Sequence, residues 1–563
     1  MPHFQVLNKH TTTFPILFPI ATLSASALLH SENPFAREWH LICRFLFCWN
    51  SLYRRMENAI AGRCSHQLWL VFLILFVLCF VLFHFDYSTM MPADNELPFS
   101  LDQINPVAVS ENQTHLATNQ SVTDESVGEE SDADTCLGRY VYVHNLPSRF
   151  NYGLLKNCQS LTRGTNSNMC PYLANLGLGT EIENSQGVLS NQSWFSTNQF
   201  SLEVIFHNKM KRYECLTNDS SLASAIFVPY YAGLDISQYL WSPNISVRDS
   251  PGKDLLNWLV ERPEWKKMWG RDHFLVAGRI SWDFRRQTDD ASDWGTKFRF
   301  LPESQNMTMM SVESSSWKND FAIPYPTNFH PFKDSQVIEW QSSVRTQDRS
   351  YLFTFAGAPR PDLSNSVRGV VIEQCRSSKA CKFINCSSEG NECDNPVNLM
   401  KVFRRSVYCL QPPGDSYTRR SIFDSILAGC IPVFFHPGTA YAQYLWHLPG
   451  NGTEYSVYIP VKDVKNWNGS VEKILLGISK DKELAMREEV IGLIPNIIYS
   501  DPRSRLESFE DAFDLAVNGV LERIERVRCV IREGKDPSIG FAEGDDYKYT
   551  FSEWQGYEKD PLF

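Results

Sequence analysis

Two apolar strands with one short helix between them set the strongest limit on how this chain can fold. SVYCL at 406–410 is typical of a buried strand, IFDSILAG at 422–429 of a helix that ends at a glycine, and CIPVFF at 430–435 of another strand. Parallel strands need a crossover such as a helix between them. The segment therefore predicts an α/β layer with a parallel sheet.

The same alternation of strands and helices recurs in two series along the chain. In the first series, strands are predicted at 139–147, 225–233 and 273–278, with helical sequence at 255–269. In the second, a strand at 349–357 is followed by a helix at 365–376. We expect two Rossmann-like lobes, an N-terminal acceptor-side lobe at 136–340 and a C-terminal lobe at 341–535, facing a cleft. Functional residues should lie at the C-terminal ends of the strands.

Length and charge narrow the class of protein. A chain of 563 residues with 43% apolar content is too long for one compact core. Its formal charge is -11 and it has no basic patch, so the electrostatic footprint of a nucleic-acid-binding protein is missing. We therefore expect no nucleic-acid partner.

An uninterrupted apolar run at 68–83 predicts a membrane anchor, with the spanning segment at 66–85. Arg54, Arg55 and Arg63 precede the run, and no further Lys or Arg occurs until Arg139. The positive-inside rule then keeps residues 1–65 in the cytosol and the rest of the chain in the lumen. A cleaved signal peptide is the alternative, but no small-residue cleavage site follows the run. Met56 is an alternative start just before the anchor.

Glycosylation sequons support the same topology, because all of them follow the apolar run and none precedes it. They are Asn112, Asn119, Asn191, Asn218, Asn244, Asn306, Asn385, Asn451 and Asn468. Residues 86–135 are polar and lack basic side chains, so we expect a flexible stem there, and a tail at 536–563.

The cysteines point to an oxidising compartment. The chain has 15 cysteines, and Cys375, Cys381, Cys386 and Cys393 are close enough in sequence for local disulfides. A zinc site is the alternative, but no C-x-x-C pair occurs in this cluster. The odd number beyond the anchor also predicts a free thiol.

The loop QPPGDSYT at 411–418 has the composition of an anion-binding loop. It leads from a predicted strand into a helix whose first amides are unpaired and carry partial positive charge. Gly414 permits close approach of the backbone, while nearby hydroxyls and the guanidinium groups of Arg419 and Arg420 can bind phosphate oxygens. The alternative is an ordinary helix capped by Asp415, Ser416 or Thr418. A P-loop is not expected because GxxxxGK[ST] is absent, and Gly177 and Gly179 do not complete a GxGxxG.

The longer segment FRRSVYCLQPPGDSYTRRSIFDSILAGCIPVFFHPGTAYAQYLWHLP resembles the donor-binding region of exostosin-type family 47 glycosyltransferases. More narrowly, it is similar to the plant xyloglucan galactosyltransferase subgroup of the KATAMARI type. GRYVYVHNLPSRFN, GRDHFLVAGRISWDFRR, IPYPTNFHP, LFTFAGAPRP and DPRSRLESFEDAFD extend the resemblance from about 138 to 534. The wider family has an arginine where this chain has Ser421, and the plant subgroup has its arginines where this chain has Arg419 and Arg420.

The resemblance implies a GT-B fold, inversion at the anomeric carbon and a single-pass type II position in the Golgi membrane. It also implies a UDP-sugar donor and no metal cofactor. An Asp-x-Asp sequence, a form that can bind a metal, occurs at 132–134, but its place in the stem argues against a metal role. Donor-binding residues are then expected at the loop and at the start of the preceding helix. These are Arg368, Gly369, Gly414, Asp415, Ser416, Tyr417, Thr418, Arg419, Arg420 and, for the ribose, Asp424.

Inverting transfer also needs a base for the acceptor hydroxyl, which we expect from the first lobe. Asp283 is the first candidate and Asp235 the second, whereas Asp272 and His273 are interpreted as a buried structural pair. Aromatic platforms for the acceptor sugar are predicted at Tyr230, Tyr231, Trp282, Tyr325 and Trp446. His330 and His436, each followed by proline, are expected in turns that line the cleft.

The function implied is transfer of β-galactose from UDP-galactose to xylosyl side chains of xyloglucan, in cell-wall hemicellulose synthesis. Two alternatives stay open: transfer of galacturonic acid from UDP-galacturonic acid, and a non-catalytic lumenal glycan-binding or scaffold protein. The GDSYTRR loop argues against the scaffold, which needs no cationic seat for a diphosphate. Other Golgi glycosyltransferases are possible partners.

Overall fold

The computed structural model describes residues 134–536, except 162–167, 185, 241, 316–318, 361–365, 388–392, 394 and 466–469. All described residues belong to one compact unit, residues 127–563. The predicted anchor, the tail beyond 536 and almost all of the stem lie outside them. No described helix is both long and apolar enough to cross a bilayer.

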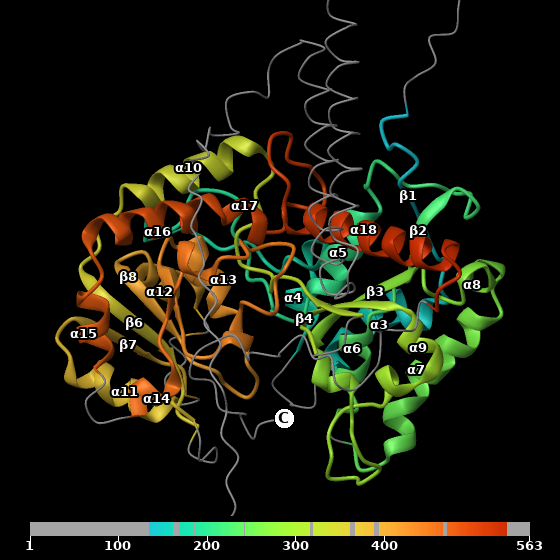
Figure 1. Ribbon diagram of the computed structural model, residues 1–563, viewed down its shortest axis with the longest axis horizontal. Helices are drawn as coiled ribbons and strands as arrows, with labels where there is room; N and C mark the ends of the chain where they lie inside the picture. Colours follow the sequence, from blue (N-terminus) through green and yellow to red (C-terminus); the bar gives the residue numbers. More distant parts are fainter. Residues whose placement is uncertain are drawn as a thin grey trace, which may run out of the picture. The chain divides into compact units, whose positions relative to one another are not determined.

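Two parallel sheets organise the described chain (Figure 1). The first sheet has the order β1-β2-β3-β4-β5 and contains β1 (Tyr140–Val143), β2 (Ala223–Phe227), β3 (His273–Ile280), β4 (Thr308–Glu313) and β5 (Asp320–Ala322). The second has the order β10-β9-β8-β6-β7 and contains β6 (Tyr351–Gly357), β7 (Cys381–Asn385), β8 (Ser406–Gln411), β9 (Ile431–Phe434) and β10 (Val457–Tyr458). We call each sheet with its helices the first and the second lobe.

Helices and short 3₁₀ turns connect the strands. Those of the first lobe are η2 (Ser148–Phe150), α3 (Tyr152–Lys156), η3 (Cys158–Ser160), α4 (Cys170–Leu173), η4 (Asn175–Gly177), α5 (Leu202–Met210), α6 (Ala232–Ser237), α7 (Ile245–Val260), α8 (Pro263–Met268), η5 (Ser281–Phe284), η6 (Phe298–Phe300) and α9 (Pro302–Asn306). Those that follow are α10 (Asp334–Arg345), α11 (Arg368–Ser377), α12 (Pro396–Phe403), α13 (Ser421–Leu427), η7 (Pro437–Thr439), η8 (Gly452–Glu454), α14 (Val461–Lys465), α15 (Val471–Leu476), α16 (Lys480–Gly492), α17 (Ile494–Ile497) and α18 (Ala512–Arg532).

Strand β3 shows why the first sheet is covered on both faces. Phe274 and Val276 belong to one buried cluster, together with α5, whereas Leu275 and Ala277 belong to another, together with α7. Side chains alternate between the two faces of a strand, so an uninterrupted apolar strand needs a helical layer on each side. The near-continuous apolar sequence of β3 is thus explained by burial on both faces.

Two helices pack across the predicted boundary between the lobes. The segment 341–535 was assigned to the C-terminal lobe, but its last helix, α18, packs against β2 of the first sheet. Helix α10, most of which was assigned to the first lobe, packs against α16 and α17. One hydrophobic cluster contains residues of α18, the first sheet and the second sheet. Helix α18 therefore packs on the first lobe, although it follows the second lobe in sequence.

Five disulfides hold the described part of the chain together. The predicted local pairs are confirmed as Cys375–Cys381 and Cys386–Cys393. Three further pairs, Cys136–Cys215, Cys158–Cys170 and Cys409–Cys430, were not predicted. The expected free thiol is Cys529, which is exposed on α18.

Candidate functional site

The strand order of the second sheet reverses between β6 and β8. From β6 the chain crosses to β7 on one side, and later places β8 on the other side of β6. In parallel α/β sheets a ligand binds outside the carboxyl ends of the strands at such a switch point. The loops that leave β6 at Gly357 and β8 at Gln411 are therefore the structural candidates for the donor site. The described first sheet has no such reversal, so its order departs from the expected Rossmann pattern.

Three guanidinium groups gather at this switch point. Arg368, on the first turn of α11, donates hydrogen bonds to the carbonyl of Pro413 at 2.9 Å and of Ala358 at 3.2 Å. Arg419 donates to the carbonyl of Ala356 at 2.7 Å, and its guanidinium lies over the Phe355 ring.

The third guanidinium belongs to Arg360, which forms a two-pronged ion pair with Asp415. Burial lowers the pKa of Arg368 to about 10, and the neighbouring Arg360 adds to this effect. Burial also lowers the pKa of Arg419 well below its ordinary value, with Arg368 and Arg360 contributing. Three cations with one carboxylate among them form a positive field suited to a diphosphate.

Gly414 lies directly against this cluster. A Cβ atom at that position would stand 2.4 Å from Nη2 of Arg368, so only glycine lets the backbone approach the guanidinium this closely. Beyond it, Gln411 and Ser421 close the base of the loop with reciprocal hydrogen bonds, of 3.1 Å between the Gln411 amide and the Ser421 carbonyl and 2.6 Å between the Ser421 hydroxyl and the Gln411 side-chain oxygen.

Alternate residues of the loop 416–420 contact different lobes. Ser416 and Thr418 bind Glu313 of β4, and Arg420 binds the carbonyl of Thr197 at 2.7 Å and the side chain of Asn328 in the first lobe. Tyr417 and Arg419 contact the second lobe instead. The Tyr417 ring stacks on His436 with centroids 4.1 Å apart, and Arg419 binds the end of β6. The loop is thus fixed to both lobes at once.

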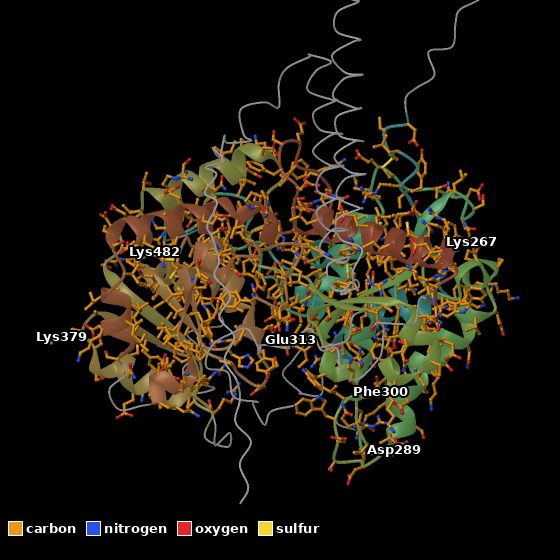
Figure 2. All side chains as sticks on the ribbon, viewed as in Figure 1. Lys267, Asp289, Phe300, Glu313, Lys379 and Lys482 are labelled. Carbon is orange, nitrogen blue, oxygen red and sulfur yellow. A yellow bond between two sulfur atoms is a disulfide. The ribbon has the colours of Figure 1, made fainter. Side chains whose placement is uncertain are left out.

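Glu313 is the main first-lobe group at the loop (Figure 2). Its Oε2 atom accepts hydrogen bonds from the Ser416 hydroxyl at 2.7 Å, the Thr418 amide at 2.8 Å and the Thr418 hydroxyl at 2.5 Å. Burial raises the pKa of the Glu313 carboxyl, and the bonds from Thr418 and Ser416 oppose that rise. Oε1 is buried with no hydrogen-bond partner among the described residues.

A cavity of about 260 Å³ lies between the loop and the first lobe. Its second-lobe wall is formed by the loop residues Pro413, Gly414, Asp415, Ser416 and Tyr417. Its first-lobe wall is formed by residues from the end of β3 and the loop after it: Ile280, Trp282, Arg285, Arg286, Gln287, Asp293 and Trp294. The cavity therefore joins the predicted donor loop to a wall containing two indole rings.

Buried ion pairs hold the first-lobe wall. Asp320 of β5 accepts hydrogen bonds from Arg285 at 2.5 Å and Arg299 at 2.8 Å, and from the Ser281 hydroxyl at 2.8 Å. Coulombic attraction to Arg285 and Arg299 outweighs burial and holds the pKa of Asp320 well below its ordinary value. Because Ser281 and Arg285 flank Trp282, this network fixes the backbone that presents Trp282 to the cavity.

Several predicted donor residues have other contacts in this structure. The hydroxyls of Ser416 and Thr418, expected to face a phosphate, donate to Glu313 instead. Arg420 binds the first lobe, and its ion pair with Asp424 spans 3.7 Å. Burial raises the pKa of Asp424, opposed by Arg420. Of the predicted donor residues, Gly414, Asp415, Ser416 and Tyr417 line the cavity, whereas Arg368, Gly369, Thr418, Arg419, Arg420 and Asp424 do not. Arg420 lies at the contact between the lobes.

Two further expectations about the loop differ from the structure. Helix α13 begins at Ser421 and its N-cap is Arg420, which makes no side-chain cap, so none of the three expected capping residues is the N-cap. Gly369, on α11, lies in a separate surface depression with Pro359, Ile372 and Arg376 rather than in the cavity.

The two candidate bases are buried and neither lines the cavity. Asp283 pairs with Arg279 at 2.5 Å, and burial raises its pKa while Arg279 opposes that rise. Asp235 accepts a 3.0 Å hydrogen bond from the Tyr230 hydroxyl, and burial raises its pKa to about 6. Asp283 lies in sequence between the cavity-lining residues Trp282 and Arg285, so it is nearer to the cavity along the chain than Asp235 is. Both roles stay predictions.

Of the five predicted acceptor aromatics, Trp282 is the one that lines the cavity. Tyr230 and Tyr231 are buried in the first lobe, and the Tyr231 hydroxyl bonds His207 at 2.9 Å. Tyr325 is buried beside Thr418, with 3.3 Å between their hydroxyls. Trp446 stacks on Phe321 with centroids 4.4 Å apart and abuts Gly519 of α18. Tyr230, Tyr231 and Tyr325 are thus core residues, and Trp446 is partly buried against the cluster that contains residues of both sheets.

The predicted histidines have structural contacts. His436 caps the 3₁₀ turn η7, as expected of a turn residue, but His330 and His436 are both buried and neither lines the cavity. The buried pair Asp272–His273 is confirmed at 2.8 Å, and its imidazole also contacts His144 at 3.1 Å. Within the described residues, no group of three or more His, Cys, Asp or Glu side chains is placed to hold a metal.

The six sequons within the described residues are exposed or partly exposed at Asn191, Asn218, Asn244, Asn306, Asn385 and Asn451. Asn112, Asn119 and Asn468 lie outside them.

Sequence reasoning missed Glu313, Arg360 and Trp294. Arg360 follows the predicted strand at 349–357, and that position could have identified it. Glu313 is the last residue of the strand at 308–313, which was not predicted.

This geometry fits one kind of enzyme. Two parallel α/β sheets, a cationic switch point and a cavity lined by a glycine loop and indole rings are the features of a transferase that handles a phosphorylated sugar donor. The chain belongs to the exostosin GT47 family, whose domain model matches residues 135–475.

Curated relatives of the chain come from Arabidopsis thaliana. The chain is 58% identical over 491 residues to the probable xyloglucan galactosyltransferase GT14, covering 87% of this chain and 94% of the relative. It is 54% identical over 440 residues to the xyloglucan galactosyltransferase MUR3, covering 77% of this chain and 71% of the relative. Solved structures are less similar: a glycosyltransferase from Rickettsia africae has a TM-score of 0.25 and 11% identity, covering 69% of this chain and 98% of that chain.

Proposed function

We propose that the protein is an inverting glycosyltransferase that moves β-galactose from UDP-galactose to xylosyl side chains of xyloglucan. The family and the names of the relatives support this donor and acceptor. The proposal includes a GT-B arrangement of the two lobes and a signal anchor at 66–85, with the catalytic portion in the Golgi lumen. Metal-independent catalysis is part of it as well.

The observation that carries the proposal is the arginine cluster at the switch point. Transfer of the sugar leaves a diphosphate whose negative charge must be stabilised as the glycosidic bond breaks. The guanidinium groups of Arg368 and Arg419 bind carbonyls at the end of β6 and in the loops after β6 and β8, beside the glycine that permits close approach of a ligand. These cations supply the stabilisation that a bound metal provides in other transferases.

The first lobe supplies the acceptor side of the reaction. Trp282 offers an aromatic face at the cavity, and Asp283 follows it as the proposed base. In this proposal the first lobe deprotonates the acceptor hydroxyl and the second lobe stabilises the departing UDP, which is the arrangement for attack with inversion. The anomeric configuration of the product reports on this directly.

A transfer assay with the full-length chain in detergent tests the proposal. The chain is incubated with a xylosylated glucan oligosaccharide and either UDP-galactose or UDP-galacturonic acid, with and without EDTA. Mass and linkage analysis of the products should show one hexose, β-linked to xylose, from UDP-galactose, and EDTA should not reduce the rate. Addition of a hexuronic acid would keep the reaction and change the donor. No transfer from either donor by a folded protein would support the scaffold alternative.

A further inference from the structure

We propose that Trp294 is a binding platform for the acceptor. The inference deepens the proposed function, on which it rests, by naming a residue that holds the acceptor. Trp294 lines the cavity opposite the donor loop and leaves 39% of its surface exposed. It was not among the aromatic residues suggested by the sequence.

Two buried arginines hold the loop that carries Trp294. Arg248 of α7 donates hydrogen bonds to the carbonyls of Asp293 and, at 2.6 Å, Ala291. Arg286 donates to the carbonyl of Gly295 at 3.0 Å and forms an ion pair of 2.8 Å with Asp249. Both arginines are only 2% exposed. The carbonyls immediately before and after Trp294 are thus bound by buried guanidinium groups, so the indole is presented by a fixed backbone.

The same loop is joined to Asp283, the proposed base. Gly295 has a φ of +85°, and a Cβ there would stand 2.6 Å from the carbonyl of Asp283. That carbonyl also accepts a 2.9 Å hydrogen bond from the amide of Thr296. A glycine is required after the tryptophan because this backbone region disfavours other residues and because the approach is so close. The backbone that carries Trp294 is therefore fixed relative to the backbone of Asp283, and so is a sugar stacked on Trp294.

Binding of oligosaccharide without donor tests this inference separately from the transfer reaction. The full-length chain is titrated by calorimetry with a xylosylated cello-oligosaccharide and with an oligogalacturonide of matched length. Trp294→Ala and Trp294→Leu should each weaken binding of the neutral ligand at least tenfold, while Trp294→Phe, which keeps a ring, should stay within about threefold. Trp269→Ala is the matched control, because Trp269 is a first-lobe indole that is 59% exposed and does not line the cavity.

The result that supports the proposal is loss of oligosaccharide binding in the Ala and Leu variants with unchanged affinity for UDP. The Leu variant retains side-chain volume, so it reports on the ring even if the Ala variant fails to fold. Neutral oligosaccharide binding within twofold of wild type in the Leu variant would overturn the platform. The oligogalacturonide serves as a control ligand. A wild-type chain that binds oligosaccharide through Trp294 but transfers no galactose would overturn the proposed function alone.

Discussion

The carboxylate of Glu313 accepts a 2.8 Å hydrogen bond from the backbone amide of Thr418, across the contact between the two lobes. A first-lobe strand thereby holds the loop whose other side faces the arginine cluster. The bond explains how a loop of five residues keeps a defined shape next to a cavity. Because Glu313 belongs to the first lobe, a movement of the loop would break this bond between the lobes.

Removing the Glu313 carboxylate should weaken use of the donor. Glu313→Ala leaves the Thr418 amide and two hydroxyls without their acceptor, at a cost of about 1–3 kcal/mol. We expect a rise of roughly tenfold or more in KM for UDP-galactose, with a smaller rise for Glu313→Gln, which keeps an acceptor oxygen. Steady-state kinetics measures this, with the exposed Glu261→Ala as a control. An unchanged KM in a folded Glu313→Ala variant would contradict the role.

Two glycines predicted to bind the donor should behave differently. A Cβ at Gly414 displaces the flexible end of Arg368, so Gly414→Ala should fold but raise KM for UDP-galactose several-fold. A Cβ at Gly369 meets nothing within 4 Å, so Gly369→Ala should leave kinetics unchanged and alter stability by at most about 1 kcal/mol. Kinetics and thermal unfolding of both variants check this. Impaired donor use in Gly369→Ala would restore its predicted role.

The disulfide Cys409–Cys430 joins β8 to the residue before β9 and encloses the donor loop, with a sequence separation of 21. Replacing both cysteines with alanine should lower the free energy of unfolding by about 3 kcal/mol. The matched control removes Cys386–Cys393, whose separation of 7 predicts a loss of about 2 kcal/mol. Urea unfolding under oxidising conditions measures both. A larger loss in the control would mean that loop closure is not the main effect.

Acid should destabilise the protein in part through His330. Its ring bonds the carbonyl of Tyr499 at 2.7 Å and the hydroxyl of Thr197 at 2.8 Å, and burial lowers its pKa to about 4 from an ordinary value of 6.5. Between these values the unfolded chain binds a proton that the folded chain does not, so stability falls as pH falls. The contribution of His330 is up to about 3 kcal/mol.

The His330→Gln variant isolates this contribution. The difference in free energy of unfolding between pH 7 and pH 4 should be smaller in the variant than in wild type. Urea unfolding at several pH values gives the comparison. Equal pH dependence in the two proteins would show that His330 is protonated as readily when folded as when unfolded.

Sequence reasoning succeeded where the signal was local. Strands such as β3 and β8 are near-continuous apolar runs, and the arginines and the glycine of the loop stand together in one segment. The contacts that place them were not predictable, since Glu313 is separated from Thr418 by about a hundred residues. The aromatics show the same limit: Trp446 resembles a surface platform in sequence, yet it stacks on Phe321 because α18 returns to the first lobe.

Binding of UDP to the full-length chain and to its Arg368→Ala variant is the decisive test of a diphosphate site at the arginine cluster. Arg368 lies at the switch point and touches the loop at Pro413, whereas Arg345 is an exposed arginine of α10 paired with Glu488 and serves as the control. Calorimetry should show UDP affinity falling at least tenfold in Arg368→Ala and staying within twofold in Arg345→Ala. If folded Arg368→Ala binds UDP as tightly as wild type, the diphosphate does not bind at this cluster and the account is wrong.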